Sequence, residues 1–195
     1  MSVTPQPADL LGRLEQVLLD PVETSGRRVR GKAAAVLVAM TDLGGDDAQV
    51  VLTRRRDDLR RHAGEISFPG GRRDPGDETL LATALREANE ETGLEPAAVR
   101  VAGALEPMST IATGYAVYPF VGVIEPGLPL SPHEAEVAEI VELPLSRLAE
   151  VYEHRSMRRR GISFKTHAFP VTDEIFVWGL TGRILHDLLG RLGLR

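Results

Sequence analysis

Three glutamates stand at helical spacing near the middle of the 195-residue chain: Glu87, Glu90 and Glu91. On an α-helix, i,i+3 and i,i+4 steps relate these positions, so their carboxylates would crowd one face. Each like-charge pair costs about 0.2–0.5 kcal/mol, and Gly93 predicts a helix end just beyond them, where the helix dipole disfavours anions. A divalent cation with oxygen ligands would make the same cluster favourable. The cluster indicates a metal site, with a solvated acidic face as the alternative.

The helix that would carry the cluster is predicted over about Thr79–Thr92. An apolar stripe at i, i+3, i+4 and i+7 spacing would face the core; it consists of Leu81, Ala84, Leu85 and Ala88. The glutamates lie about 115° round from this stripe at 100° per residue, at the margin between core and solvent. Arg86 is spaced to pair with Glu90 at i,i+4 and to orient it. A metal held there would sit at a cleft edge that a substrate could reach.

The segment before the helix adds two adjacent glycines in Phe68-Pro69-Gly70-Gly71. Adjacent glycines let the backbone turn tightly and approach an ion or a phosphate closely. Glu78 follows, seven residues separate it from Arg86, and the chain continues as Arg86-Glu87-x-x-Glu90-Glu91-x-Gly93-Leu94. This combination resembles the Nudix box of the Nudix hydrolases.

The usual Nudix box reads glycine, five residues, glutamate, seven residues, then Arg-Glu-apolar-x-Glu-Glu-x-Gly-apolar. Six residues separate Gly71 from Glu78 here, so we expect a loop one residue longer, and Ala88 fills the apolar position. The resemblance implies a single α/β domain over residues 1–195, a Nudix-type α/β/α sandwich with a mixed central sheet. The box would span about residues 71–94.

The resemblance also implies roles for individual residues and a Mg²⁺ or Mn²⁺ cofactor. The metal ligands would be Glu87, Glu90, Glu91 and the carbonyl of Gly70. Glu78 and Arg86 would brace the loop and the helix. The catalytic residues would be Arg86 in that role, Glu90, and a base drawn from the box or from the later acids Glu134, Glu136 and Glu139, among which Glu136 is favoured.

A second pattern narrows the class of substrate. Leu52-Thr53-x-Arg55 leads after four residues to Arg60, then after three to Gly64, and after three more to Phe68-Pro69-Gly70-Gly71. This is similar to the signature of the coenzyme A pyrophosphatase branch of the family, with Val51 and Arg56 as departures. The substrate-binding residues implied are Arg55, Arg60, Phe68, Gly70 and Gly71.

The branch implies metal-dependent hydrolysis of the diphosphate linkage of coenzyme A, a small-molecule substrate, to 3′,5′-ADP and 4′-phosphopantetheine. The alternatives are another nucleotide substrate, such as ADP-ribose, NADH or a nucleoside triphosphate, and a non-catalytic binding module. The module is disfavoured because every box glutamate is present. A second basic segment, residues 155–160, is either a solvated turn or a grip for the 3′-phosphate of coenzyme A.

Composition is that of a soluble globular domain, with 43% apolar and 26% charged residues. A net charge of −5 gives no reason to expect nucleic-acid binding, and no run approaches the 18 apolar residues of a membrane span. The absence of cysteine excludes disulfides and thiolate metal sites and fits the cytoplasm. Helices over about 9–19 and 181–192 would be additions to the core, and they could support a homodimer. Strands are expected near 33–40, 50–53, 100–105, 116–124, 139–143 and 171–178.

Overall fold

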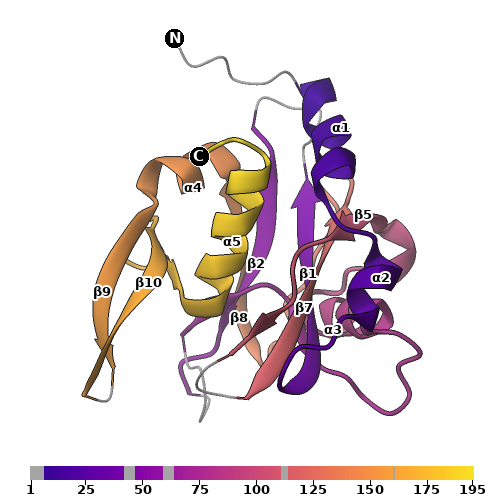
Figure 1. The fold of residues 1–195 in the computed structure, drawn as a ribbon, viewed down its shortest axis with the longest axis horizontal. Helices are drawn as coiled ribbons and strands as arrows, with labels where there is room; N and C mark the ends of the chain where they lie inside the picture. Colours follow the sequence, from indigo (N-terminus) through magenta and orange to yellow (C-terminus); the bar gives the residue numbers. More distant parts are fainter. Residues whose placement is uncertain (1–6, 42–46, 59–63, 111–113, 160) are drawn as a thin grey trace.

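The computed structural model describes residues 7–41, 47–58, 64–110, 114–159 and 161–195, and Figure 1 shows its arrangement. A large mixed sheet forms the centre, in which β1 (Lys32–Thr41) and β7 (Tyr115–Val123) run parallel. The other pairings in this sheet are antiparallel. They involve β2 (Gln49–Arg55), β3 (Ile66–Ser67), β4 (Gly70–Arg72), β5 (Arg100–Ala104), β6 (Met108–Ser109) and β8 (Val137–Pro144).

A smaller antiparallel sheet follows in the order β11-β10-β9. It contains β9 (Glu153–Arg159), β10 (Ile162–Pro170) and β11 (Phe176–Trp178), and Figure 1 shows β9 and β10 extending away from the main sheet. The helices are α1 (Pro7–Val17), α2 (Pro21–Gly26), α3 (Leu80–Thr92), α4 (Leu145–Val151) and α5 (Gly179–Arg191), with a short 3₁₀ turn at Pro96–Ala98.

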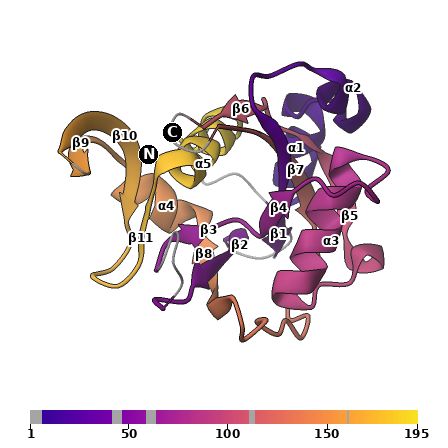
Figure 2. The same ribbon diagram turned by 90° about the horizontal axis from the view of Figure 1, so that it is seen from below.

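Strand β1 separates two apolar cores because successive side chains point to opposite faces of a sheet. Ala35 and Leu37 pack with residues of α3 such as Ala84. Val38 and Met40 pack on the other side, with α5 residues that include Ile184, Leu185 and Leu188. Figure 2 shows α3 and α5 on opposite sides of β1. The expected α/β/α arrangement with a mixed central sheet is therefore confirmed.

Helix α3 begins and ends as its sequence predicts. The Thr79 side chain caps the first turn by accepting a hydrogen bond from the Ala82 amide at 3.0 Å. Gly93 adopts the left-handed conformation at φ 68° and donates its N–H to the Asn89 carbonyl at 2.8 Å. The helix thus ends immediately after the glutamate cluster.

Several segments differ from expectation, among them strand β10, where the sequence predicts no strand. Helix α1 lies two residues before the predicted 9–19 range. Residues 155–159 belong to strand β9, paired with β10, rather than to a turn. Only the last three residues of the predicted 171–178 strand are extended, because the Thr172 hydroxyl accepts hydrogen bonds from the amides of Glu174 and Ile175 and closes a turn. No helix in the described parts of the chain is long and apolar enough to cross a membrane.

Three histidines meet where the small sheet packs against α5. His154 and His167 are cross-strand partners in β9 and β10, with ring centroids 5.0 Å apart. The His186 ring on α5 lies 4.0 Å from that of His167. The Tyr152 hydroxyl and His167 Nδ1 form a hydrogen bond of 2.9 Å. This group is called the histidine cluster below.

Candidate active site

Arg86 is the centre of an ion-pair network between the loop before α3 and the helix itself. Its guanidinium lies 3.0 Å from Asp77 Oδ1, 3.0 Å from Glu87 Oε1 and 3.1 Å from Glu90 Oε2. It also donates a hydrogen bond of 3.2 Å to the carbonyl of Arg72. The hydrogen bonds from Arg86 hold the pKa of Asp77 well below its usual range, although burial opposes this. Arg86 therefore connects the loop to the helix through these contacts.

The acid that pairs with Arg86 from the loop is Asp77 and not Glu78, which corrects the expectation for Glu78. The Asp77 carboxylate also accepts hydrogen bonds of 2.9 Å from the Asp74 amide and the Thr83 hydroxyl. Glu78 is exposed, and its backbone carbonyl accepts a hydrogen bond from Arg73. Five residues separate Gly71 from Asp77. The loop thus has the usual length, and the additional residue lies between Asp77 and Arg86.

Glu91 is the most buried of the three helix glutamates, at 8% exposure. Gly70 donates its backbone N–H to Glu91 Oε2 at 3.4 Å, and Arg55 Nη1 lies 3.9 Å from Oε1. Burial raises the pKa of Glu91 to about 7, partly opposed by the positive charge of Arg55. Burial also raises the pKa of Glu87, against the opposing effect of Arg86. Both carboxylates are desolvated beyond what the nearby arginines compensate.

The loop between β7 and β8 brings Glu136, the favoured base, to the same place. The free carbonyls at the end of α3 accept hydrogen bonds from this loop, Thr92 from the Ser131 amide at 2.8 Å and Glu91 from the His133 amide at 2.9 Å. Glu136 follows, and its Oε2 lies 3.5 Å from Arg55 Nη2. Arg55 therefore lies between Glu91 and Glu136.

The two other acids considered as the base lie elsewhere, Glu139 on strand β8 and Glu134 exposed in the loop. Glu139 forms an ion pair of 2.9 Å with Arg54 on the neighbouring strand β2. The backbone carbonyl of Glu134 accepts a hydrogen bond of 2.7 Å from Arg56. Glu136 is thus the loop acid that shares an arginine with the helix cluster.

Both glycines of β4 are required by their surroundings. A Cβ atom on Gly71 would overlap the carboxylate of Glu87, and one on Gly70 would overlap backbone atoms of Ala35 and Val36. Phe68 is 2% exposed and packs in the larger of the two apolar cores. Its side chain therefore stabilises the glycine segment from the core, which differs from the substrate-binding role expected for it. Arg60 lies outside the described residues.

The donor set fits a hard divalent cation. Within the described ranges no three acids or histidines stand in a ready coordination arrangement, and arginine nitrogens lie within 4 Å of the carboxylates of Glu87, Glu90 and Glu91. These side chains nevertheless supply carboxylate oxygens from one helix face beside a glycine backbone. The desolvated carboxylates of Glu87 and Glu91 are the groups that a cation would stabilise.

Comparison with known proteins identifies the class. The NUDIX domain family matches residues 31–162. The uncharacterized Nudix hydrolase NudL of Escherichia coli O7:K1 is 37% identical over 189 residues, covering 96% of this chain and 95% of that protein. NudL of Photorhabdus laumondii is 43% identical over 141 residues, 71% of this chain and 74% of that protein. The chain therefore belongs to the Nudix hydrolase family.

Solved structures agree with this fold. RenU, a Nudix hydrolase from M. smegmatis, has a TM-score of 0.51 and 25% identity, covering 61% of this chain and 74% of that one. A MutT/nudix family protein from Enterococcus faecalis has a TM-score of 0.57 at 12% identity, covering 100% of this chain and 76% of that one. As a Nudix hydrolase, the protein belongs to a class that acts on nucleoside diphosphate derivatives and generally uses divalent metal ions such as Mg²⁺ or Mn²⁺.

Proposed function

We propose that this Nudix hydrolase cleaves the diphosphate linkage of coenzyme A or its derivatives and releases 3′,5′-ADP and 4′-phosphopantetheine. The observation that carries the proposal is the position of Arg55, which belongs to the segment similar to the coenzyme A pyrophosphatase signature. Its guanidinium lies between Glu91 and Glu136. Its Nε is buried and has no hydrogen-bond partner among the described residues. The side chain is nevertheless 28% exposed, so a substrate phosphate could reach its outer nitrogens and match the guanidinium geometry.

The metal would be held by Glu87, Glu90, Glu91 and the Gly70 carbonyl. When bound, Mg²⁺ or Mn²⁺ would offset the charge of the diphosphate and favour ionisation of the attacking water. Arg86 acts as a positioning residue, because it contacts the carboxylates of Glu87 and Glu90 and ties them to the loop. The Gly70 amide orients the carboxylate of Glu91 in the same way.

The proton of the attacking water would pass to Glu136. Its side chain is exposed on a loop anchored to the end of α3 and is directed toward Arg55, so a substrate phosphate held by Arg55 would lie beside it. The water oxygen forms a bond to one phosphorus, the bond from that phosphorus to the bridging oxygen breaks, and the bridging oxygen leaves on the other phosphate. Glu90, exposed on the same side of the helix, is the alternative base.

A panel assay with Mg²⁺ or Mn²⁺ against coenzyme A, ADP-ribose, NADH and dGTP tests the substrate. We expect the highest kcat/KM with coenzyme A. A preference for one of the other three would replace the proposed substrate, and turnover of none would contradict hydrolysis altogether.

The Glu136→Gln variant tests the base, with Glu134→Gln as the matched control. We expect about a 10²-fold lower kcat for Glu136→Gln, in the range of general-base catalysis, and little change for the control. Full activity of Glu136→Gln, with loss in Glu90→Gln at unchanged metal affinity, would move the role to Glu90.

A further inference from the structure

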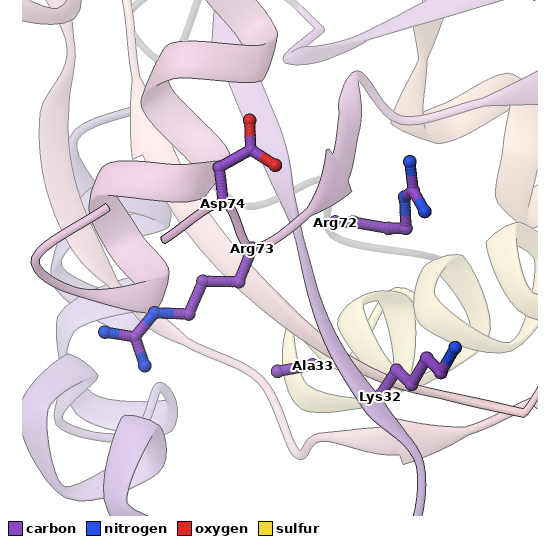
Figure 3. Close-up of a pocket in the computed structure, with 5 residues that line it drawn as sticks. All are labelled: Lys32, Ala33, Arg72, Arg73 and Asp74. Carbon is purple, nitrogen blue, oxygen red and sulfur yellow. The ribbon is translucent and has the colours of Figure 1, made fainter. Parts of the chain in front are cut away.

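A basic pocket of about 500 Å³ opens beside the glycine-rich strand β4. It is lined by Lys32, Ala33, Arg72, Arg73 and Asp74 (Figure 3). The pocket adjoins the candidate active site through the backbone, because Arg72 follows Gly71 directly and its carbonyl accepts the hydrogen bond from Arg86. Arg72 and Gly71 point to opposite faces of the sheet, so a substrate that occupied both the box and the pocket would reach across strand β4.

Two cations of the pocket are presented on the same side of the sheet. Ala34 on β1 is the cross-strand partner of Arg72 on β4, and Lys32 lies two residues before Ala34. Cross-strand partners share a face, as do residues two apart along a strand, so Lys32 and Arg72 are diagonal neighbours. Figure 3 shows their side chains extending to the same side, whereas Arg73 extends in the opposite direction.

The charges of the pocket are not balanced within the protein. Neither the Lys32 ammonium nor the Arg72 guanidinium forms an ion pair or hydrogen bond with any residue that the structure describes, and both side chains are exposed. Arg73 differs, because its guanidinium donates hydrogen bonds to the carbonyls of Asp77 and Glu78, each 3.0 Å long. The acid of the pocket, Asp74, lies 3.9 Å from Arg86. In a chain of net charge −5, two neighbouring unpaired cations suit an anionic ligand.

We propose that Lys32 and Arg72 form a subsite for a terminal phosphate group of the substrate, separate from the diphosphate linkage that is cleaved. This inference rests on the proposed function, which supplies the substrate that would reach across β4. The 3′-phosphate of coenzyme A is one source of such a group, and the terminal phosphate of a nucleoside triphosphate is another. An ammonium and a guanidinium together match a phosphate dianion in charge and in hydrogen-bond donors.

The other basic segment, at residues 155–159, is less suited to this role. Arg155 forms an ion pair of 2.9 Å with Glu153 and lies over the ring of Phe176. The positive charge of Arg155 is therefore already paired within the small sheet. Arg155 is thus a weaker candidate for binding the 3′-phosphate than Lys32 and Arg72.

The Lys32→Met and Arg72→Met variants test the subsite through their ligand binding and substrate turnover. Lys165→Met, at an exposed position of β10, is the control. Calorimetry in EDTA would measure the affinity of each protein for 3′,5′-ADP, 5′-AMP and ATP. Assays with metal would compare kcat/KM for coenzyme A with kcat/KM for 3′-dephospho-coenzyme A. We expect the wild-type protein to bind 3′,5′-ADP about tenfold more tightly than 5′-AMP, with each variant losing most of that ratio. The ratio of kcat/KM for coenzyme A over the dephospho compound should fall similarly, and Lys165→Met should leave both ratios unchanged.

The outcomes separate this proposal from the function on which it rests. Equal losses toward 3′,5′-ADP and 5′-AMP, or no loss toward any ligand, would overturn the subsite. Loss toward ATP alone would support the subsite and assign it to a triphosphate. A wild-type protein that hydrolyses neither coenzyme A compound, but binds 3′,5′-ADP in a Lys32-dependent manner, would overturn the proposed substrate and support the subsite.

Discussion

At the scale of single residues, Arg86 explains how α3 tolerates acids close to its end. Its guanidinium contacts the carboxylates of Asp77, Glu87 and Glu90, so three carboxylates share one cation. Glu91 has a weaker compensation, since the nearest Arg55 nitrogen is 3.9 Å away. Glu91, the most buried glutamate of the cluster, therefore has the least compensation for its desolvation.

The pairing of Arg86 with Asp77 predicts different effects for two adjacent acids. Asp77→Asn removes the charge that holds Arg86 against the loop, so we expect a loss of about 2 kcal/mol in stability and about tenfold lower kcat/KM. Glu78→Gln should resemble wild type in both respects. Urea denaturation and steady-state kinetics would measure these effects. A larger loss in Glu78→Gln would return the bracing role to Glu78.

Glu91→Gln should remove most metal-dependent turnover and stabilise the metal-free fold. The folded pKa of Glu91, about 7, lies above the ordinary value of 4.5. Between these values the folded state binds the proton more strongly, so this contribution to stability is lost as pH rises through about 7. The glutamine variant should therefore be more stable by about 2 kcal/mol at pH 8 and by less at pH 5.

Denaturation in EDTA at pH 5 and pH 8 would measure this difference, with the exposed Glu174→Gln as control. Metal titration and turnover would be followed in parallel. Retention of full activity by Glu91→Gln would remove Glu91 from the metal site.

At the scale of elements, the two glycines of β4 have different neighbours, so substituting each by alanine should have a different effect. A Cβ on Gly71 meets the end of the Glu87 side chain, which can rotate away, whereas one on Gly70 meets the fixed backbone of β1. Gly71→Ala should therefore lower turnover and metal affinity about tenfold with little change in stability. Gly70→Ala should destabilise the fold by about 2 kcal/mol. Thermal unfolding and Mn²⁺ titration would separate the two, and equal destabilisation would contradict the distinction.

Prediction from sequence succeeded where the signal was local. The apolar stripe, Thr79 and Gly93 defined α3 to within one residue because caps and periodicity act over a few positions. The pairing of Asp77 with Arg86 was not predicted because the sequence does not indicate which of two adjacent acids, Asp77 or Glu78, faces the arginine. The five-residue spacing from Gly71 was the available signal. Strand β9, Glu153–Arg159, was missed because its polar sequence lacks apolar alternation and its strand character depends on pairing with β10.

Residues brought together only by the tertiary fold were beyond prediction. Lys32 and Arg72 become neighbours through the pairing of β1 with β4. The histidine cluster joins side chains from β9, β10 and α5, and nothing near His154 in the sequence indicates His186. Sequence reasoning thus defined the central helix of the site better than its surroundings.

At the scale of the whole molecule, the histidine cluster predicts a loss of stability in mild acid. Burial, followed by the charges of His186, His154, Arg195 and Arg183, lowers the pKa of His167 to about 4. Asp187 acts in the opposite sense on His186, and Tyr152 shares the hydrogen bond with His167. Because the unfolded histidine has a pKa near 6.5, the unfolded chain binds the proton more strongly between pH 6.5 and 4. Stability present above pH 6.5 is then lost as pH falls toward 4.

The contribution of His167 should be about 1–2 kcal/mol over that range, after allowance for partial solvent exposure. His167→Gln should flatten the dependence of unfolding free energy on pH between 7 and 4.5. The exposed His133→Gln provides the control. Parallel curves for His167→Gln and wild type would show that the cluster does not carry this dependence.

The parallel pairing of β1 with β7 also determines the order in which the protein can fold. Lys32 pairs with Tyr115 and Met40 with Val123, so the glycine-rich strand and α3 lie entirely within the connection between the two strands. Pairing across so long a connection is slow, because its loop-closure entropy is lost before the contacts form. During synthesis, a ribosome that has released only the Nudix box has not yet released the strand beside which β1 must lie. The helix with its acidic face can form early, but the site it belongs to is completed late.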